Sequence, residues 1–243
     1  MIVQNGLMVV ELHMHGVVLR PTLVWDENDA VLFDTGMPGQ TEQLLRAIEE
    51  AGIPFERVKA VVLTHQDLDH VGGLPELLRR AQHRIKVWAH AADRPHIEGA
   101  LPLLKTDPNR MSPEAWAALP ESMQSLYKDP PKSKVDDLIE DGMRLPWCGG
   151  IAAIHTPGHT DGHLSFFLER SRTLVAGDAL VAKDGVLHGP AARTTPNIDE
   201  AYDSLQKLIP LAMERIVCYH GGLVEREPAK QIERLIASRT DHS

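Results

Sequence analysis

Residues able to bind a metal ion are concentrated in one short stretch of the chain, His65-Gln66-Asp67-Leu68-Asp69-His70. Four of its six side chains are imidazoles or carboxylates. This mixture of nitrogen and oxygen ligands suits zinc, manganese or ferrous iron. A polar loop that precedes a helix can have a similar composition, because acidic groups stabilise a helix N-terminus. Taken alone, the stretch therefore indicates either a metal site or a helix-capping loop.

Three further ligand-type residues decide between these alternatives, because each follows an apolar run and has glycine beside it. His159 lies in Thr156-Pro157-Gly158-His159-Thr160, Asp178 follows Gly177, and His220 precedes Gly221-Gly222. Loops at strand ends are where folds display functional groups. Because four expected strand ends carry such residues, the pattern favours convergence on one metal site.

The elements that must position these residues alternate between strands and helices. The apolar run 58–63 is typical of a buried strand and leads directly into the first stretch. Further strands are expected at 2–11, 16–25, 30–33, 86–89, 151–155, 164–168, 173–176 and 215–218, and helices at 41–51, 74–82, 198–208 and 228–238. The runs 2–11 and 16–25 are expected to pair around a turn at 13–16. Two strand-rich halves of this kind can pack as a four-layer αββα sandwich of the α/β class.

Between the two halves, the segment 92–134 differs in character. Prolines recur in it, and the short helical pieces between them carry leucine, methionine and tryptophan. It is too apolar for a solvated linker. We therefore expect a helical insertion within a single domain that covers residues 1–243. It is expected both to cover the sheet edge and to form a lid or wall of the pocket, and the choice between a lid and an oligomer interface stays open. Met111, Trp116 and Met123 are the candidates for substrate contact.

Composition limits the partners and the location. With 25 Lys and Arg against 34 Asp and Glu, the net charge is −9, and the chain lacks a basic stripe for nucleic acid. No apolar run approaches the roughly 20 residues of a membrane span. Cys148 and Cys218 are too few for a disulfide framework. We expect a cytoplasmic protein that acts on a small-molecule substrate, with no nucleic-acid or membrane partner. The oligomeric state stays open.

The whole set of motifs, from Asp34-Thr35-Gly36 to His220, resembles the metallo-β-lactamase superfamily, which includes glyoxalase II-like thioesterases and lactonases. The resemblance implies two divalent metal ions, zinc first, with manganese or iron as alternatives. It places His65, Asp67 and His159 on the first ion and Asp69, His70 and His220 on the second, with Asp178 bridging them. A hydroxide between the ions would be the nucleophile. Asp69 would be catalytic, receiving and relaying a proton.

Two departures refine this expectation. Asp67 stands where the family pattern H-x-H-x-D-H has its second histidine. The carboxylate makes the site one unit less positive, which is expected to raise the pKa of a bound water and to favour manganese or iron. The alternative is that the Asp67 side chain is too short to reach the metal ion, so that the first site is weak or empty. The best-known zinc β-lactamases have a cysteine where this chain has Asp178, and they lack a histidine ligand at the position of His70. In having both Asp178 and His70, the chain resembles the glyoxalase II and lactonase branches instead.

The function expected first is hydrolysis of a small carboxylic ester, lactone or thioester. The alternatives are β-lactam hydrolysis, oxidation by a mononuclear iron centre as in persulfide dioxygenases, nucleic-acid processing, which the acidic charge disfavours, and a non-catalytic metal-binding protein. Fold analogy alone does not choose between them.

The remaining conspicuous residues are expected to support the site or the core. Asp34 is expected to orient a metal ligand from outside the ligand set, and His163 to shape the loop of His159. His155 is expected to be packed or hydrogen-bonded on its strand. Cys218 is expected in the core, and Cys148 is expected to be inert.

Overall fold

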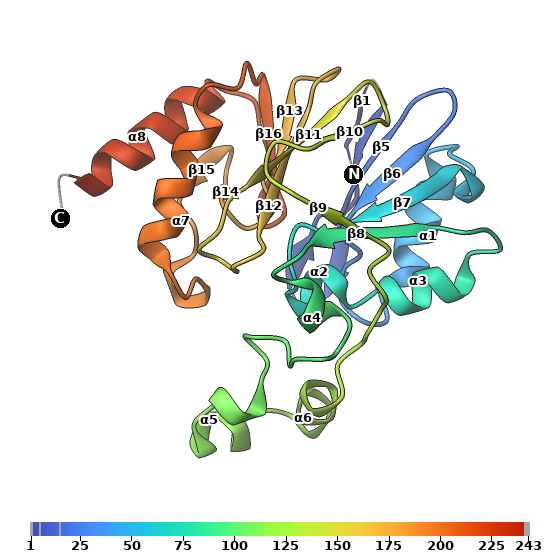
Figure 1. Ribbon diagram of the computed structural model, residues 1–243, viewed down its shortest axis with the longest axis vertical. Coiled ribbons are helices and arrows are strands. Elements are labelled where there is room, and N and C mark those ends of the chain that lie inside the picture. Colours follow the sequence, from blue (N-terminus) through green and yellow to red (C-terminus); the bar gives the residue numbers. More distant parts are fainter. Residues whose placement is uncertain (1, 5, 15, 241–243) are drawn as a thin grey trace.

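Two β-sheets packed face to face form the centre of the computed structural model, which describes residues 2–4, 6–14 and 16–240 (Figure 1). In order across the sheet, the first contains β1 (Ile2–Gln4), β2 (Leu7–Val9), β5 (Thr22–Trp25), β6 (Ala30–Phe33), β7 (Val58–Val62), β8 (Lys86–His90) and β9 (Asp137–Ile139). The second contains β10 (Arg144–Leu145), β11 (Ile151–His155), β12 (Leu164–Leu168), β13 (Thr173–Val175), β16 (Arg215–Cys218) and β17 (Gly222–Val224).

Strand direction brings the functional loops to one edge. In the first sheet β6, β7, β8 and β9 are parallel neighbours. In the second sheet β11 and β13 are each antiparallel to β12, and β13 is parallel to β16. β11, β13 and β16 therefore run in the same direction, and their carboxyl ends lie at the same edge.

The central strands are buried on both faces. Along β6, Val31 and Phe33 face the second sheet, and the Phe33 ring lies 5.1 Å from that of Phe166 on β12. Ala30 and Leu32 belong to the outer core instead. This alternation follows from the two-residue period of a strand. A strand covered on both sides is apolar throughout, as the sequence is here.

Helices form the outer two layers (Figure 1). Against the first sheet lie α1 (Thr41–Glu50) and α3 (Leu74–Arg80), which bury Leu44, Ile48 and Leu77. Outside the second sheet, α7 (Ile198–Leu205) and α8 (Pro228–Thr240) contribute Leu205 and Ile232 to a third core cluster. The expected αββα sandwich is therefore confirmed. Among the described residues, no helix is both long and apolar enough to cross a membrane.

The N-terminal region differs from the two long strands expected. Instead of continuing through 2–11, the chain turns back at Gly6, whose φ of +80° favours glycine, and β1 pairs with β2. A short ribbon of β3 (Leu12–Met14) and β4 (Val17–Leu19) then forms, as a hairpin at the expected place. The turn expected at 13–16 includes residue 15, which lies outside the described residues. A second ribbon joins β14 (Val181–Lys183) to β15 (Val186–His188).

The segment 92–134 contains α4 (Arg94–Ile97), α5 (Pro113–Ala117) and α6 (Glu121–Lys128), with a short 3-10 turn, η2 (Pro108–Arg110). Ile97 and Leu103 anchor its beginning in the outer core of the first sheet. Neither α5 nor α6 has a buried residue, and both project away from the sheets in Figure 1. The remaining short elements are α2 (Leu68–Val71), η1 (Phe55–Arg57), η3 (Ala192–Thr194) and η4 (Gln206–Leu208).

Candidate metal centre

The loop after β7 carries four of the seven expected ligand residues. His65 and Asp67 precede α2, with Asp67 on extended backbone, and α2 itself carries Asp69 and His70. Asp67 precedes this helix, but its side chain makes no capping hydrogen bond. Asp67 is therefore not a capping residue of α2.

The other three expected ligand residues come from the second sheet, each from a different strand end. His159 follows β11, Asp178 follows β13 and His220 follows β16. The hydrogen bond from Leu164 N to Thr64 O, 2.8 Å long, joins the two sheets beside the site. Seven residues spread over more than 150 positions of sequence thus reach one place.

The seven side chains form two groups, and within each group the possible ligand atoms lie within 4.8 Å of one another. The first group contains His65, Asp67, His159 and Asp178, and the second contains Asp69, His70 and His220. Asp178 lies between the groups, because its Oδ2 is 3.3 Å from His159 Nε2 and 3.4 Å from His220 Nε2. Its Oδ1 is 3.4 Å from His70 Nε2. This geometry suits a bridging carboxylate.

Buried atoms without a partner show that cations fit this cluster. Nε2 of His65, Nε2 of His70, Oδ1 of Asp67 and Oδ1 of Asp178 are buried, and none makes a well-aligned hydrogen bond within the described residues, although both imidazole nitrogens lie within ion-pair distance of a carboxylate. Leaving such polar atoms unsatisfied is costly. Imidazole nitrogens and carboxylate oxygens are the donors that divalent zinc, manganese and iron accept. The donor set therefore fits metal ions.

In the absence of metal ions, the histidines and carboxylates of the cluster shift one another's pKa values. Burial raises the pKa of Asp178, but His220 and His70 outweigh it and hold that pKa well below its usual range. In turn, burial lowers the pKa of His220, but Asp178 and Asp69 raise it to about 10. The pKa of His70 also lies well above its usual value, because Asp34, Asp69 and Asp178 outweigh its burial. Protons thus occupy this cluster when metal ions do not.

Asp34 fixes the orientation of His70, as expected from the sequence. Its Oδ2 lies 2.8 Å from His70 Nδ1, and its carboxylate also accepts hydrogen bonds of 2.8 Å from the backbone and hydroxyl of Thr64. A proton on Nδ1 leaves the Nε2 lone pair of His70 facing the cluster. Asp34 has a φ of +59°, a left-handed conformation that Asp and Asn adopt more readily than other residues.

His163 supports Asp178 without joining the two groups. Its Nε2 accepts a hydrogen bond of 2.9 Å from the Asp178 backbone, and its Nδ1 lies 2.8 Å from the Thr156 hydroxyl. Complete burial holds the pKa of His163 well below its usual value, so the ring is neutral. The expectation of a supporting role is confirmed. His155 is packed as expected, stacked on His90 at 4.2 Å.

Three residues near the site have no counterpart in the sequence-based expectations. The Tyr219 hydroxyl donates to Asp69 O at 2.6 Å, and its ring lies 3.8 Å from that of His70. Asp93 is buried and hydrogen-bonds both the loop of His65 and the loop of His159. Lys105 from the segment 92–134 reaches Asp67. A polar residue after the apolar run of β8 could have drawn attention to Asp93, but no spacing pattern marks Tyr219 or Lys105.

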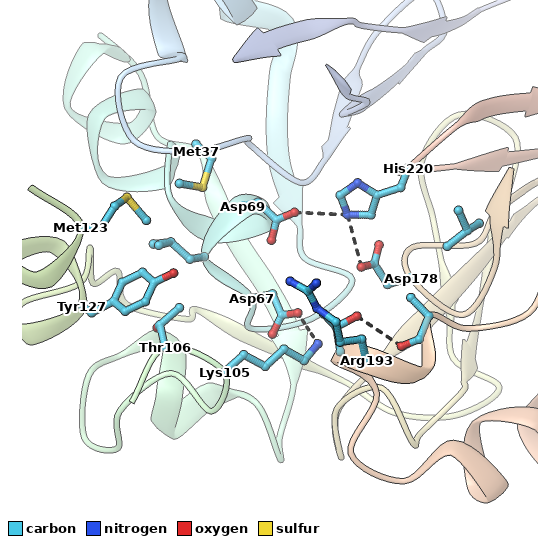
Figure 2. A pocket seen from close by; sticks show the side chains of 14 residues that line it. Met37, Asp67, Asp69, Lys105, Thr106, Met123, Tyr127, Asp178, Arg193 and His220 are labelled. Atoms are coloured by element: carbon cyan, nitrogen blue, oxygen red, sulfur yellow. Dashed lines mark hydrogen bonds and ion pairs between the residues drawn. The ribbon is translucent and has the colours of Figure 1, made fainter. Parts of the chain in front are cut away.

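A pocket of about 590 Å³ opens onto the cluster (Figure 2). Its polar lining comes from Asp67, Asp69, Lys105, Thr106, Asp178, Arg193, Thr194 and His220, and its apolar lining from Met37, Leu68, Met123, Tyr127, Val181 and Ala191. Figure 2 shows Met37, Met123 and Tyr127 opposite Asp178 and His220. Met123 therefore fits the expectation of a pocket residue.

Two other candidates from the same segment do not line the pocket. Met111 is absent from the lining, and Trp116 instead lies under Lys128, with the ammonium 5.5 Å from its ring. Trp116 lies on α5 and Met111 lies just before it, and helical spacing alone does not reveal that neither lines the pocket. Of the cysteines, Cys218 lies in the core, and burial raises the pKa of the Cys148 thiol to about 12, consistent with an inert residue.

Comparison with known proteins agrees with this fold and site. A family model described as the metallo-beta-lactamase superfamily matches residues 21–220. The probable metallo-hydrolase YflN of Bacillus subtilis is 29% identical over 231 residues, covering 86% of this chain and 83% of the relative. The hydroxyacylglutathione hydrolase GloC of Haemophilus influenzae is 27% identical over 163 residues, covering 65% of each chain.

Among solved structures, the metallo-beta-lactamase family protein TTHA1429 of Thermus thermophilus superposes with a TM-score of 0.71. The match covers 97% of this chain and 80% of the other, at 22% sequence identity. At this identity the likeness shows the shared fold. Together with the family match over most of the sequence, it leads to the conclusion that this chain belongs to the metallo-beta-lactamase superfamily and is one of its hydrolases.

Proposed function

We propose that this protein hydrolyses a small carboxylic ester, lactone or thioester with two divalent metal ions. The first ion would be held by His65, Asp67 and His159, and the second by Asp69, His70 and His220, with Asp178 shared. One observation carries the proposal: two groups of donors meet at Asp178 on the floor of a pocket whose opposite wall is apolar. Such a pocket suits a small substrate with an apolar acyl part.

When bound, the ions would polarise the scissile carbonyl and lower the pKa of the attacking water. Asp69 lines the pocket, and its Oδ2 lies 3.2 Å from His220 Nε2. Although burial raises the pKa of Asp69, His70 and His220 bring it below its usual value, so the carboxylate is ionised at neutral pH. It can accept the proton released when water attacks, and return it to the leaving group. Met37, Leu68 and Met123 would orient the acyl part.

Two features support this function over its alternatives. The second group, Asp69, His70 and His220, provides donors that a mononuclear iron oxidase or a single-ion binding protein would not need. The name of the Haemophilus relative, a hydroxyacylglutathione hydrolase, supports a thioester among the possible substrates. No feature of the pocket favours a β-lactam, and the net charge of −9 opposes nucleic-acid substrates. The free cysteines fit a reducing compartment such as the cytoplasm.

The test combines metal content with a substrate panel. Protein reconstituted separately with zinc, manganese and iron is analysed for metal and assayed on a thioester, a lactone, a carboxylic ester, a β-lactam and a phosphodiester. We expect about two ions per chain and the highest kcat/KM on one of the first three substrates. A plateau at one iron per chain with oxygen consumption, or dominant phosphodiester cleavage, would overturn the proposal.

A further inference from the structure

Lys105 brings a positive charge into the first group of donors. Its ammonium hydrogen-bonds Asp67 Oδ2 (Figure 2) and also His159 Nε2, and its side chain is only 19% exposed. The two acceptor atoms are 3.1 Å apart, and both face this ammonium. His159 Nδ1 lies 3.0 Å from the Thr195 hydroxyl, so a proton on Nδ1 leaves the Nε2 lone pair free to accept. No described residue of the second group contacts Lys105.

The backbone beside Lys105 is held by the same loop that carries Asp67. Leu104 N donates to Gln66 Oε1 at 3.0 Å. Gln66 is held in turn by Asp93, which accepts hydrogen bonds from its backbone nitrogen at 3.0 Å and from its side chain at 3.1 Å. Lys105 therefore reaches Asp67 from an anchored position rather than from the exposed part of the segment 92–134.

Asp93 also ties this arrangement to the loop of His159. It accepts hydrogen bonds from the Thr160 hydroxyl at 2.8 Å and from Gly162 N at 3.1 Å. One buried carboxylate thus holds the loops of Asp67 and His159 directly and, through Gln66, the backbone beside Lys105. The contact between the lysine and the first group is built into the fold.

We propose that Lys105 offsets the charge of Asp67 when the first ion is bound. The His159 Nε2 lone pair and the unpartnered Asp67 Oδ1 then go to the ion, while the ammonium keeps its contact with Asp67 Oδ2, so that Asp67 and Lys105 together take the place of a neutral ligand. Asp67 adds one negative charge where the family pattern has a neutral histidine, and Lys105 adds one positive charge against the same carboxylate. The expected loss of positive charge at the first ion is thereby cancelled. This inference rests on the proposed assignment of the first group to a metal ion.

The proposal has a definite consequence for metal binding. A cation held beside the first group repels a divalent ion there, so Lys105 weakens binding of the first ion. Asp67 is what holds the ammonium in place. Removing the lysine should therefore tighten binding of the first ion when residue 67 is aspartate, and should change this binding little when residue 67 is histidine.

A double-mutant cycle tests this coupling. Zinc affinities are measured by competition with a chromophoric chelator for the wild type, Lys105→Gln, Asp67→His and the double variant. The binding step that Asp67→Ala abolishes is assigned to the first group. We expect Lys105→Gln to tighten this step roughly tenfold in the wild-type background and less than about twofold in the Asp67→His background. Lys105→Arg, which keeps the charge, should bind zinc like the wild type.

Lys128→Gln, in the same segment but beside Trp116, is the matched control and should change neither step. Thermal unfolding separates the charge effect from a structural one: Lys105→Gln should lower the melting temperature of the metal-free protein and leave that of the loaded protein unchanged or higher. Equal effects of Lys105→Gln in both backgrounds, no effect, or weaker zinc binding with a lower melting temperature in both states would each overturn the proposal. These readouts need no substrate, so they stand apart from a failure to find the hydrolysed compound.

Discussion

The sandwich and the segment 92–134 contribute to the same pocket in different ways. Sandwich side chains such as His65, His70 and His159 are at most 1% exposed, and supporting residues fix them. The helices α5 and α6 of the segment have no buried residue, yet Met123 and Tyr127 reach the pocket from α6. The sandwich thus provides the donor cluster, whereas the segment provides part of the pocket wall.

This difference indicates how the two regions tolerate change. Metal ligands must be held within narrow limits of distance and direction, which buried strand ends and their hydrogen bonds provide. A pocket wall determines substrate preference through packing, and exposed segments accept substitutions more easily. Changes in the sandwich should therefore affect metal binding and turnover together, whereas changes in the segment should alter substrate affinity alone. Lys105 is the exception that links the two regions.

The largest effect is expected from Asp178→Asn, because Asp178 lies between both groups of donors. Metal content should fall well below two ions per chain, and kcat/KM should fall by more than the roughly 100-fold reached by substitutions outside the ligand set. Elemental analysis and steady-state kinetics measure both quantities. Asp161→Asn, at an exposed position of the neighbouring loop, is the control. Full metal content and ordinary activity in this variant would show that the two groups of donors do not need Asp178 to bind metal.

A smaller effect is expected from Asp34→Asn, which keeps a residue that tolerates the left-handed backbone but weakens the hold on His70. Affinity for the second ion should fall by about 10–100-fold while the fold is retained. Chelator competition measures the affinity, and circular dichroism checks the fold. An unchanged affinity would mean that the sandwich does not need this support to orient His70.

The next largest effect is expected from pH, because protons compete with metal ions for the histidines of the cluster. The pKa of His220 is about 10 and that of His70 is raised, so both bind protons at neutral pH in the metal-free protein. Metal binding must displace these protons, so affinity should increase between pH 6 and pH 9 by about tenfold per pH unit for each proton released. Calorimetry in buffers of different ionisation enthalpy counts the protons. Met123→Ala should release the same number, since the segment supplies neither histidine.

The smallest effect is expected from Met123→Ala in the pocket wall. Loss of apolar contact should raise KM about threefold to tenfold while kcat and metal content stay close to those of the wild type. The same measurement on Met111→Ala, outside the lining but in the same segment, should show no change. A fall in metal content caused by Met123→Ala would contradict the separation of the two regions.

Some parts of this arrangement could be read from the sequence because they have a local cause. The apolar run of β7 predicts a buried strand, and the ligand-type residues directly after it mark a site at its end. The layers of the sandwich follow from the alternation of strands and helices in both halves. Boundaries were less predictable at the N-terminus, where the turn at Gly6 and the short ribbon of β3 and β4 divide what the pattern suggests are two strands.

The segment 92–134 shows where such reasoning stops. Its composition predicts helices with apolar side chains, and the structure has them. Which of Met111, Trp116 and Met123 faces the pocket depends on how η2, α5 and α6 lie against the sandwich, and of these three residues only Met123 lines the pocket. The pairing of Lys105 with Asp67, across 38 positions of sequence, depends on the anchoring of Leu104 by Gln66.

From the sequence, the resemblance of its motifs to a known superfamily indicated the family and the seven candidate ligands, and apolar periodicity indicated the αββα layering, because both depend on local patterns. Only the tertiary structure decided that Asp93 joins the loops of Asp67 and His159, and that a lysine contacts Asp67. These relations join residues that are far apart in the chain. Their distances are set by how the two sheets pack and by where the chain returns to the same edge, which no short pattern encodes.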